Sequence, residues 1–214
     1  MSAQLSVVLS TARTLVNDDL ATVFTDPVLI PKVHEAHREL QEQLWLAGSP
    51  IVREQSSPLV VSKDTKLLDL GTTSPVLPND LLCPIKLYEN LPNADEITDG
   101  WHEMTEVFYI PLGVTLSDNF TWWAWRKEKL YLAGGNNDRA IIIQYRKRIW
   151  EPATVYNEIG ILFGEMYLAA RAAALTAGTL GNKEVYDAMT ALAEKNLATV
   201  ITANRGAQRP LMAV

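Results

Sequence analysis

The sequence predicts an α+β fold: an antiparallel α-helical bundle from N- and C-terminal helices with a central β-rich insertion. Apolar residues recur at helical spacing near both ends. Prolines interrupt the middle of the chain too often for long helices, and short β-like runs lie between them. The predicted domains are a helical bundle of residues 1–50 and 151–204, a β-rich insertion of residues 51–150, and an extended C-terminal tail of residues 205–214.

Two amphipathic helices are predicted at the N-terminus. The apolar face of the first consists of Leu5, Val8, Leu9, Ala12, Leu15 and Val16. Thr25 or Asp26 is expected to cap the second helix, with Pro27 in its first turn and Gly48 at its end. Pro31 removes a helical hydrogen bond, so this helix either starts at Pro31 or bends in its first turn.

Strands are predicted for the middle of the chain, where the runs are short. They lie at residues 59–61, 66–70, 85–88 and 107–110. The clearest hairpin pairs residues 127–132 with residues 140–149, because the connector 133–138 is rich in turn-forming residues.

Two further helices are predicted after the strands. Thr154 is the expected cap of the third, whose apolar positions from Val155 to Ala173 step alternately by four and three residues. Asn182 is the expected cap of the fourth, and the short turn between them predicts antiparallel packing. From Arg205 on, glycine, glutamine and proline favour an extended tail.

Composition restricts the classes of function. Among 214 residues, Lys+Arg number 19 and Asp+Glu 25, and the net charge of -6 argues against a surface that grips DNA. The single cysteine, Cys83, excludes an intramolecular disulfide and fits a reducing compartment. The N-terminus lacks the features of a signal peptide, and no apolar run reaches the ~18 residues of a membrane helix. The longest candidate, residues 159–175, is interrupted by Glu165 and Arg171.

No group of residues has catalytic or metal-binding spacing. His34 and His37 are three residues apart, whereas the metalloprotease signature places its histidines four apart, and a zinc site needs further ligands. Cys83 in a β-like run is typical of a small buried hydrophobe. Gly134 and Gly135 lead into a strand, whereas a phosphate-binding loop leads into a helix. We therefore expect no catalytic residues, no cofactor and no metal.

Trp122, Trp123 and Trp125, followed by Arg126, form the densest aromatic cluster. Consecutive strand residues point to opposite faces, so we expect one face in the core and the other at a subunit interface, where aromatic residues and arginine are enriched. Stacking on nucleic-acid bases is the alternative, which the acidity of the chain disfavours.

Several short stretches carry a resemblance that spans most of the chain. In order they are TDP (25–27) with HEAHREL (34–40), LPNDLL (77–82) with PIKLYE (84–89), GWHEM (100–104), and IQYR (143–146) with YLAAR (167–171). Each is weak alone, and their order resembles that of the head–tail connector (adaptor) proteins of tailed bacteriophages.

The resemblance implies a virion protein without catalysis, at the head–tail junction and in the host cytoplasm during assembly. Such adaptors form a ring, commonly twelvefold, that joins the portal protein to a downstream tail or stopper protein. DNA passes through the lumen without specific binding, and no membrane is involved. The C-terminal segment, here Arg205, Gln208, Arg209 and Leu211, is then expected to dock into the portal.

Two alternatives remain at this stage. The same faces would serve a tail-completion or tail-tube structural protein. An enzyme is the third reading, in the form of a metal-dependent hydrolase built on His34, His37 and a carboxylate such as Glu103.

Overall fold

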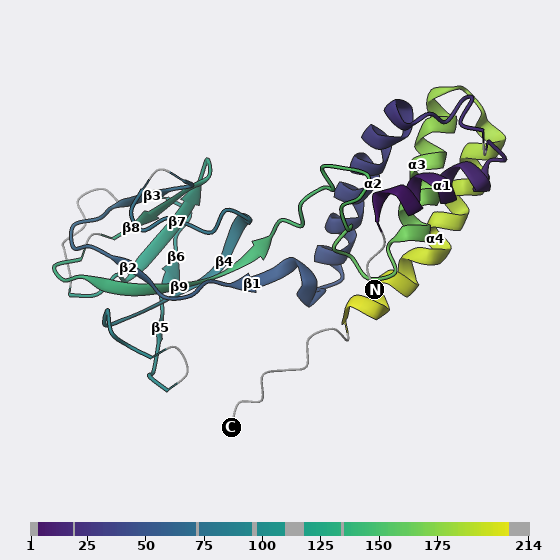
Figure 1. Ribbon diagram of the computed structural model, residues 1–214. Coiled ribbons are helices and arrows are strands. Elements are labelled where there is room, and N and C mark those ends of the chain that lie inside the picture. The colour runs from purple at the N-terminus through teal and green to yellow at the C-terminus, as the bar shows by residue number, and fades with distance from the viewer. Residues whose placement is uncertain are drawn as a thin grey trace. The chain divides into compact units, whose positions relative to one another are not determined.

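The computed structural model describes residues 4–18, 20–71, 73–95, 98–109, 118–133 and 135–205. The chain divides into two compact units, and Figure 1 labels the helices and strands of each. Met1–Val52 and Ile149–Val214 form the first, here called the helical unit. Arg53–Arg148 form the second, here called the β unit.

The helical unit is organised around one alanine-rich helix. Its elements are α1 (Leu5–Leu15), α2 (Asp26–Leu46), the 3-10 turn η1 (Pro50–Val52), α3 (Glu165–Thr179) and α4 (Lys183–Arg205). Helix α3 is buried around most of its circumference, and α1, α2 and α4 all pack on it. A helix that is apolar on nearly all sides belongs in an interior, and its small side chains let its neighbours approach closely.

The predicted fold class, an antiparallel helical bundle with one central β-rich insertion, was wrong. The described residues form an α+β protein with four α-helices and nine strands in two sheets. The helices are not four equivalent neighbours, because α1 and α2 barely touch each other and pack on α3 instead. The alanines of α3 are the physical reason, since they allow helices to approach it on several sides.

The predicted start of the third helix at Thr154 was also wrong. Helix α3 begins at Glu165, and Thr154 donates its backbone N–H and its hydroxyl to Asn157 Oδ1 in an irregular segment. Gly160 and Phe163 have φ of 72° and 55°, values that a right-handed helix does not contain. The apolar spacing arises because the irregular segment also packs into the helical core.

Helix α2 runs continuously through Pro31, so the alternative start at Pro31 was wrong. The backbone of Thr25 is extended and precedes the helix, and Pro27 lies in the first turn as predicted. The apolar positions of α2, among them Leu29, Val33 and Leu40, are fully buried.

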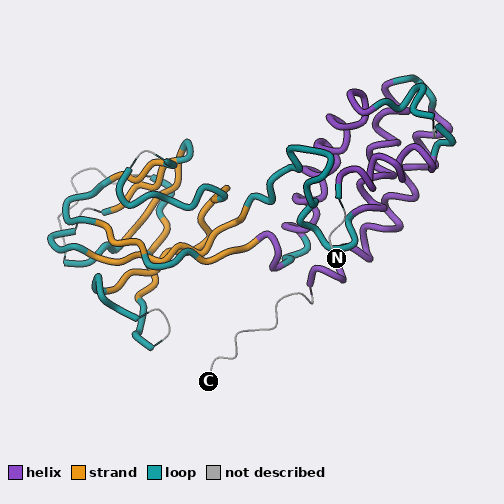
Figure 2. The backbone as a smooth tube through the Cα atoms, in the orientation of Figure 1, coloured by secondary structure: helices purple, strands orange, loops and turns teal. Residues whose placement is uncertain are grey.

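The β unit contains two sheets that share one core (Figure 2). The first contains β1 (Arg53–Gln55), β9 (Arg139–Lys147), β4 (Leu81–Asn90) and β5 (His102–Glu103) in this order, and β2 (Leu59–Val61) also pairs with β9. The second has the order β3 (Leu67–Asp69), β8 (Lys129–Leu132), β7 (Trp122–Arg126), β6 (Thr105–Glu106). All described pairs are antiparallel except β6 with β7.

The predicted hairpin between residues 127–132 and 140–149 was wrong. Strand β8 forms its hairpin with β7 across Lys127 and Glu128, whereas β9 pairs with β4 in the other sheet. Both turn residues have positive φ, 48° and 60°, which is a type I′ turn made without glycine or asparagine. The sequence therefore carries no turn signal where the hairpin occurs.

Candidate functional site

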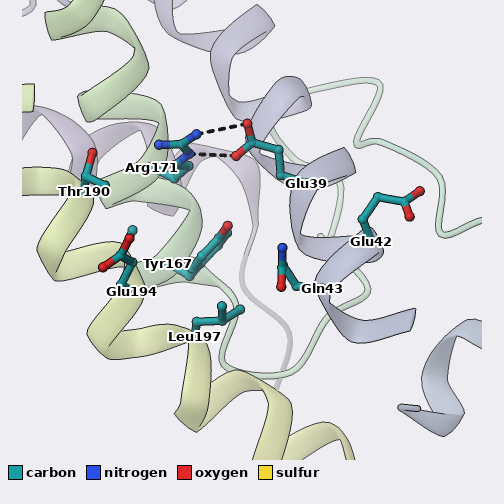
Figure 3. A pocket seen from close by; sticks show the side chains of 9 residues that line it. Glu39, Glu42, Gln43, Tyr167, Arg171, Thr190, Glu194 and Leu197 are labelled. Atoms are coloured by element: carbon teal, nitrogen blue, oxygen red, sulfur yellow. Dashed lines mark hydrogen bonds and ion pairs between the residues drawn. The ribbon is translucent and has the colours of Figure 1, made fainter. Parts of the chain in front are cut away.

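A pocket of ≈ 590 Å³ lies within the helical unit between α2, α3 and α4 (Figure 3). Its walls come from all three helices and consist of Glu39, Glu42, Gln43, Tyr167, Arg171, Thr190, Ala193, Glu194 and Leu197. The volume falls within the range of about 300–1,000 Å³ that is typical of small-ligand pockets.

A forked ion pair closes one side of this pocket. Arg171 donates from Nε to Glu39 Oε2 at 2.6 Å and from Nη2 to Glu39 Oε1 at 3.1 Å. The hydrogen bond to Glu39 raises the pKa of the Arg171 guanidinium above its usual range. Beside it, burial raises the pKa of the Tyr167 phenol, and the charge of Glu39 adds to this effect. The wall therefore presents a fixed ion pair and a neutral phenol.

A hydroxyl with unused hydrogen-bonding capacity lies on the α4 wall. Thr176 and Thr202 donate their hydroxyls to the carbonyl four residues earlier, at 2.9 and 2.8 Å. Thr190 Oγ1 is buried and has no hydrogen-bond partner among the residues that the structure describes. This oxygen is enclosed by the protein, so it offers no hydrogen-bonding group to a ligand in the pocket.

Sequence reasoning missed this pocket. The signal that could have found it is Arg171, a charge with alanines on both sides, since a partly buried cation requires a carboxylate partner. Spacing along the chain does not identify Glu39 as that partner, because the two residues meet only when α2 packs on α3.

The predicted interface cluster lies on β7 and is split between two environments. Trp123 is 1% exposed and belongs to the core of the β unit, and Trp125 is partly buried against the same core. Trp122 is half-buried on the opposite face of the strand, and Arg126 is exposed. Core burial thus removes Trp123 from the set of residues that a partner could reach.

Arg126 organises two exposed aromatic residues beside β7. Its guanidinium donates to the backbone carbonyl of Phe108 and lies over the Tyr109 ring, 5.8 Å from the centroid. Phe108 and Tyr109 are each 81% exposed. We call Phe108, Tyr109, Trp122 and Arg126 the aromatic surface; sequence patterns alone had identified only its last two members.

Of the predicted portal-docking residues, only Arg205 falls within the described part of the chain. It is the last residue of α4 rather than part of an extended tail, and its Nη2 donates to the carbonyl of Ala47 at 3.1 Å. Asn204 is fully buried; its side-chain Nδ2 donates to the carbonyls of Leu162 and Val200, and its backbone carbonyl accepts from Ser49 Oγ. Gln208, Arg209 and Leu211 lie outside the described residues.

The two histidines fasten an irregular segment to α2. His34 Nε2 lies 3.2 Å from the carbonyl of Pro152, and His37 Nε2 lies 3.3 Å from that of Ile159. Gln41 Nε2 donates to His37 Nδ1 and to the carbonyl of Ile149, while Gln41 Oε1 accepts from the N–H of Ile149. His37 is therefore a neutral imidazole that donates from Nε2, and burial lowers its pKa.

The structure does not bring His34, His37 and Glu103 together as ligands of a metal, as the hydrolase alternative would require. Glu103 lies on β5, where Lys86 Nζ pairs with it at 2.9 Å. Within the described ranges, no group of three or more His, Cys, Asp or Glu side chains is placed to hold a metal ion. Cys83 lies on β4 opposite Arg146 of β9, and is partly exposed.

Comparisons with known proteins leave the chain without an assigned family. No protein-family model matches it, and no curated protein matches it. Among the described helices, none is long and apolar enough to cross a bilayer.

Proposed function

We propose that this protein is a structural virion component, a ring-forming adaptor that joins the portal of a tailed bacteriophage to the next tail component and lets DNA pass. One observation carries the proposal, and it concerns the short sequence stretches in which the chain resembles the adaptor proteins. Although they are dispersed along the sequence, the fold brings them together in pairs.

In the helical unit, the stretches HEAHREL and YLAAR meet at the ion pair of Glu39 with Arg171, whose shortest distance is 2.6 Å. In the β unit, PIKLYE of β4 pairs with IQYR of β9, with Leu87 opposite Ile143. LPNDLL joins the same group, because Tyr145 donates its hydroxyl to Asp80 at 2.9 Å.

The stretch GWHEM also pairs with another of these stretches. GWHEM supplies β5, which pairs with β4 so that Glu103 lies opposite Tyr88. Residues that hold the fold together in pairs are those expected to recur within a structural family. This pairing of the stretches within the fold is what supports the proposal.

Other features fit the proposed role. The aromatic surface offers rigid, amphipathic side chains of the kind enriched at protein interfaces. The end of α4 is held by the hydrogen bonds of Asn204 and Arg205, and the proposed docking segment follows it in the sequence. A net charge of -6 is compatible with a ring through whose lumen DNA passes without binding to the wall.

The test is the copy number of this protein in purified virus particles of its source, measured by mass spectrometry with labelled peptides. We expect a count that matches a ring at the portal vertex, commonly twelve. A count in the hundreds would instead assign the protein to the tail tube or capsid, and absence from the particle would refute a virion role.

A second experiment tests the docking step. Full-length protein should co-sediment with the portal protein, and a chain ending at Arg205 should not. A circular dichroism spectrum with unchanged helical signal is the control that the truncated chain is folded, because α4 ends at Arg205. Undiminished portal binding by the truncated chain would contradict the docking role of Gln208, Arg209 and Leu211.

A further inference from the structure

A second hollow, of ≈ 470 Å³, lies on the exposed side of α4 near its C-terminal end. Its walls are Ala198, Thr199, Thr202 and Ala203 of α4 and Phe163 of the irregular segment before α3. None of these five side chains carries a charge. The Thr202 hydroxyl donates to the carbonyl of Ala198 at 2.8 Å, so its proton is already used within the helix. The hollow therefore suits an apolar ligand.

The aromatic wall of this hollow is strained and exposed. Phe163 is 60% exposed and has φ of 55°. A left-handed backbone angle is unfavourable for a bulky side chain, and it persists only where the surrounding structure imposes it. Here the carbonyl of Leu162 accepts from Asn204 Nδ2 of α4 at 3.0 Å, which holds the preceding residue against the helix. The ring is thus kept beside the hollow before any ligand arrives.

The chain that follows α4 contains an apolar segment within reach of this hollow. Residues 206–214, of which the structure describes none, have the sequence GAQRPLMAV, and residues 211–214 include no polar side chain. The farthest wall on α4, Ala198, lies seven residues before Arg205, or about 10 Å along the helix. Nine extended residues span up to about 30 Å, so this segment can turn back at Gly206 and still reach Phe163.

The segment of the same chain has an advantage over that of a second copy. A short flexible tether gives a ligand an effective concentration in the millimolar range. A second copy offers the same residues only at the concentration of the protein in solution. A weak apolar contact is therefore enough to hold the tethered segment.

We propose that the hollow beside Phe163 binds residues 211–214 of its own chain when no partner holds them. Leu211 and Met212 occupy the hollow, and the ring of Phe163 covers them along one edge. One consequence rests on the proposed function, namely that the portal and the hollow compete for Leu211. The contact itself is tested without the portal, so its failure would leave the adaptor proposal standing.

The experiment compares the full chain with a chain ending at Arg205, which retains every described helix and strand, by nuclear magnetic resonance. We expect the signals of Phe163 and Ala198 to differ between the two chains. A peptide of residues 206–214, added to the shortened chain, should return both signals to their full-chain positions. The same peptide with Leu211→Ser and Met212→Ser should not.

Two results would overturn the proposal. One is a full chain and a shortened chain with identical signals at Phe163 and Ala198. The other is a full-chain spectrum that approaches that of the shortened chain on dilution, since the occupant would then come from a second copy.

Two variants of the shortened chain test the assigned contacts. Phe163→Gly removes the ring, accepts positive φ without steric cost and should weaken peptide binding about tenfold or more. Ala198→Glu places a charge in the hollow and should weaken binding to a similar extent. The matched control is Ala191→Glu, the same change at an exposed position of α4 outside the hollow. If Ala191→Glu weakened binding as much as Ala198→Glu, or if Phe163→Gly left it unchanged, the assignment would be wrong.

Discussion

Replacing Arg139 by Met is expected to destabilise the β unit by about 3–5 kcal/mol. Arg139 of β9 donates to Glu89 of β4 through Nε at 2.6 Å and Nη2 at 3.0 Å. Their side chains are 9% and 2% exposed, respectively. Methionine replaces the arginine stem but leaves the carboxylate of Glu89 buried and without its partner, and this uncompensated charge dominates the cost.

Urea unfolding followed by tryptophan fluorescence measures this loss. Four of the six tryptophans belong to Arg53–Arg148, so the signal reports mainly on the β unit. With a slope of about 1–3 kcal/mol per molar urea, the midpoint should fall by roughly 1–5 M. The matched control is Lys86→Met, also in the β4–β9 sheet, which breaks the exposed pair with Glu103 and should shift the midpoint far less.

A double variant separates the buried charge from other effects. Glu89→Leu combined with Arg139→Met leaves no buried charge, so it should recover most of the stability that Arg139→Met loses. If the double variant were as unstable as the sum of the two single variants, the two side chains would not be coupled. That result would refute the reasoning, as would an Arg139→Met midpoint equal to that of Lys86→Met.

Four further variants have expected outcomes. Because the folded state holds His37 neutral with a lowered pKa, the unfolded chain takes up a proton below about pH 6.5 that the folded chain does not. Stability should therefore be level above that pH and fall below it by up to about 1.4 kcal/mol per pH unit, and His37→Gln, assayed by helical circular dichroism, should remove the slope. Glu128→Gly should stabilise the β unit by about 0.5–1 kcal/mol, since glycine adopts positive φ without a steric cost, and a lowered melting temperature would contradict the type I′ turn. Trp123→Ala should cost about 3–5 kcal/mol as a core truncation. Trp122→Ala should cost much less stability and should impair self-association, measured by analytical ultracentrifugation; unchanged self-association would remove Trp122 from the interface.

Local periodicity predicted the positions of several elements correctly. Helices α1, α2 and α4 lie where apolar spacing indicated, because each buries one face against α3. Strand β9 likewise coincides with the run of isoleucines in residues 140–149. In these elements the local pattern and the tertiary environment agree, and this is the condition under which spacing is informative.

The errors arose where a few backbone angles decide the structure. Phe163 and Gly160 at positive φ end any helix before α3, yet Val155, Ile159 and Leu162 keep the spacing of a helix. Lys127 and Glu128 form a turn at positive φ, although neither is a residue type that is typical of such turns. The pocket was missed for another reason, because Glu39 and Arg171 come together only through tertiary packing.

The division of the helical unit between the two ends of the chain has a consequence for synthesis on the ribosome. The apolar faces of α1 and α2 emerge first, but α3, the surface that covers them, follows the whole β unit. At about 5–20 residues per second this interval lasts on the order of ten seconds. The β unit is continuous in sequence and can complete its sheets within that time. We therefore expect nascent chains to hold a finished β unit beside uncovered helices, which makes this interval the stage at which chaperones are needed most.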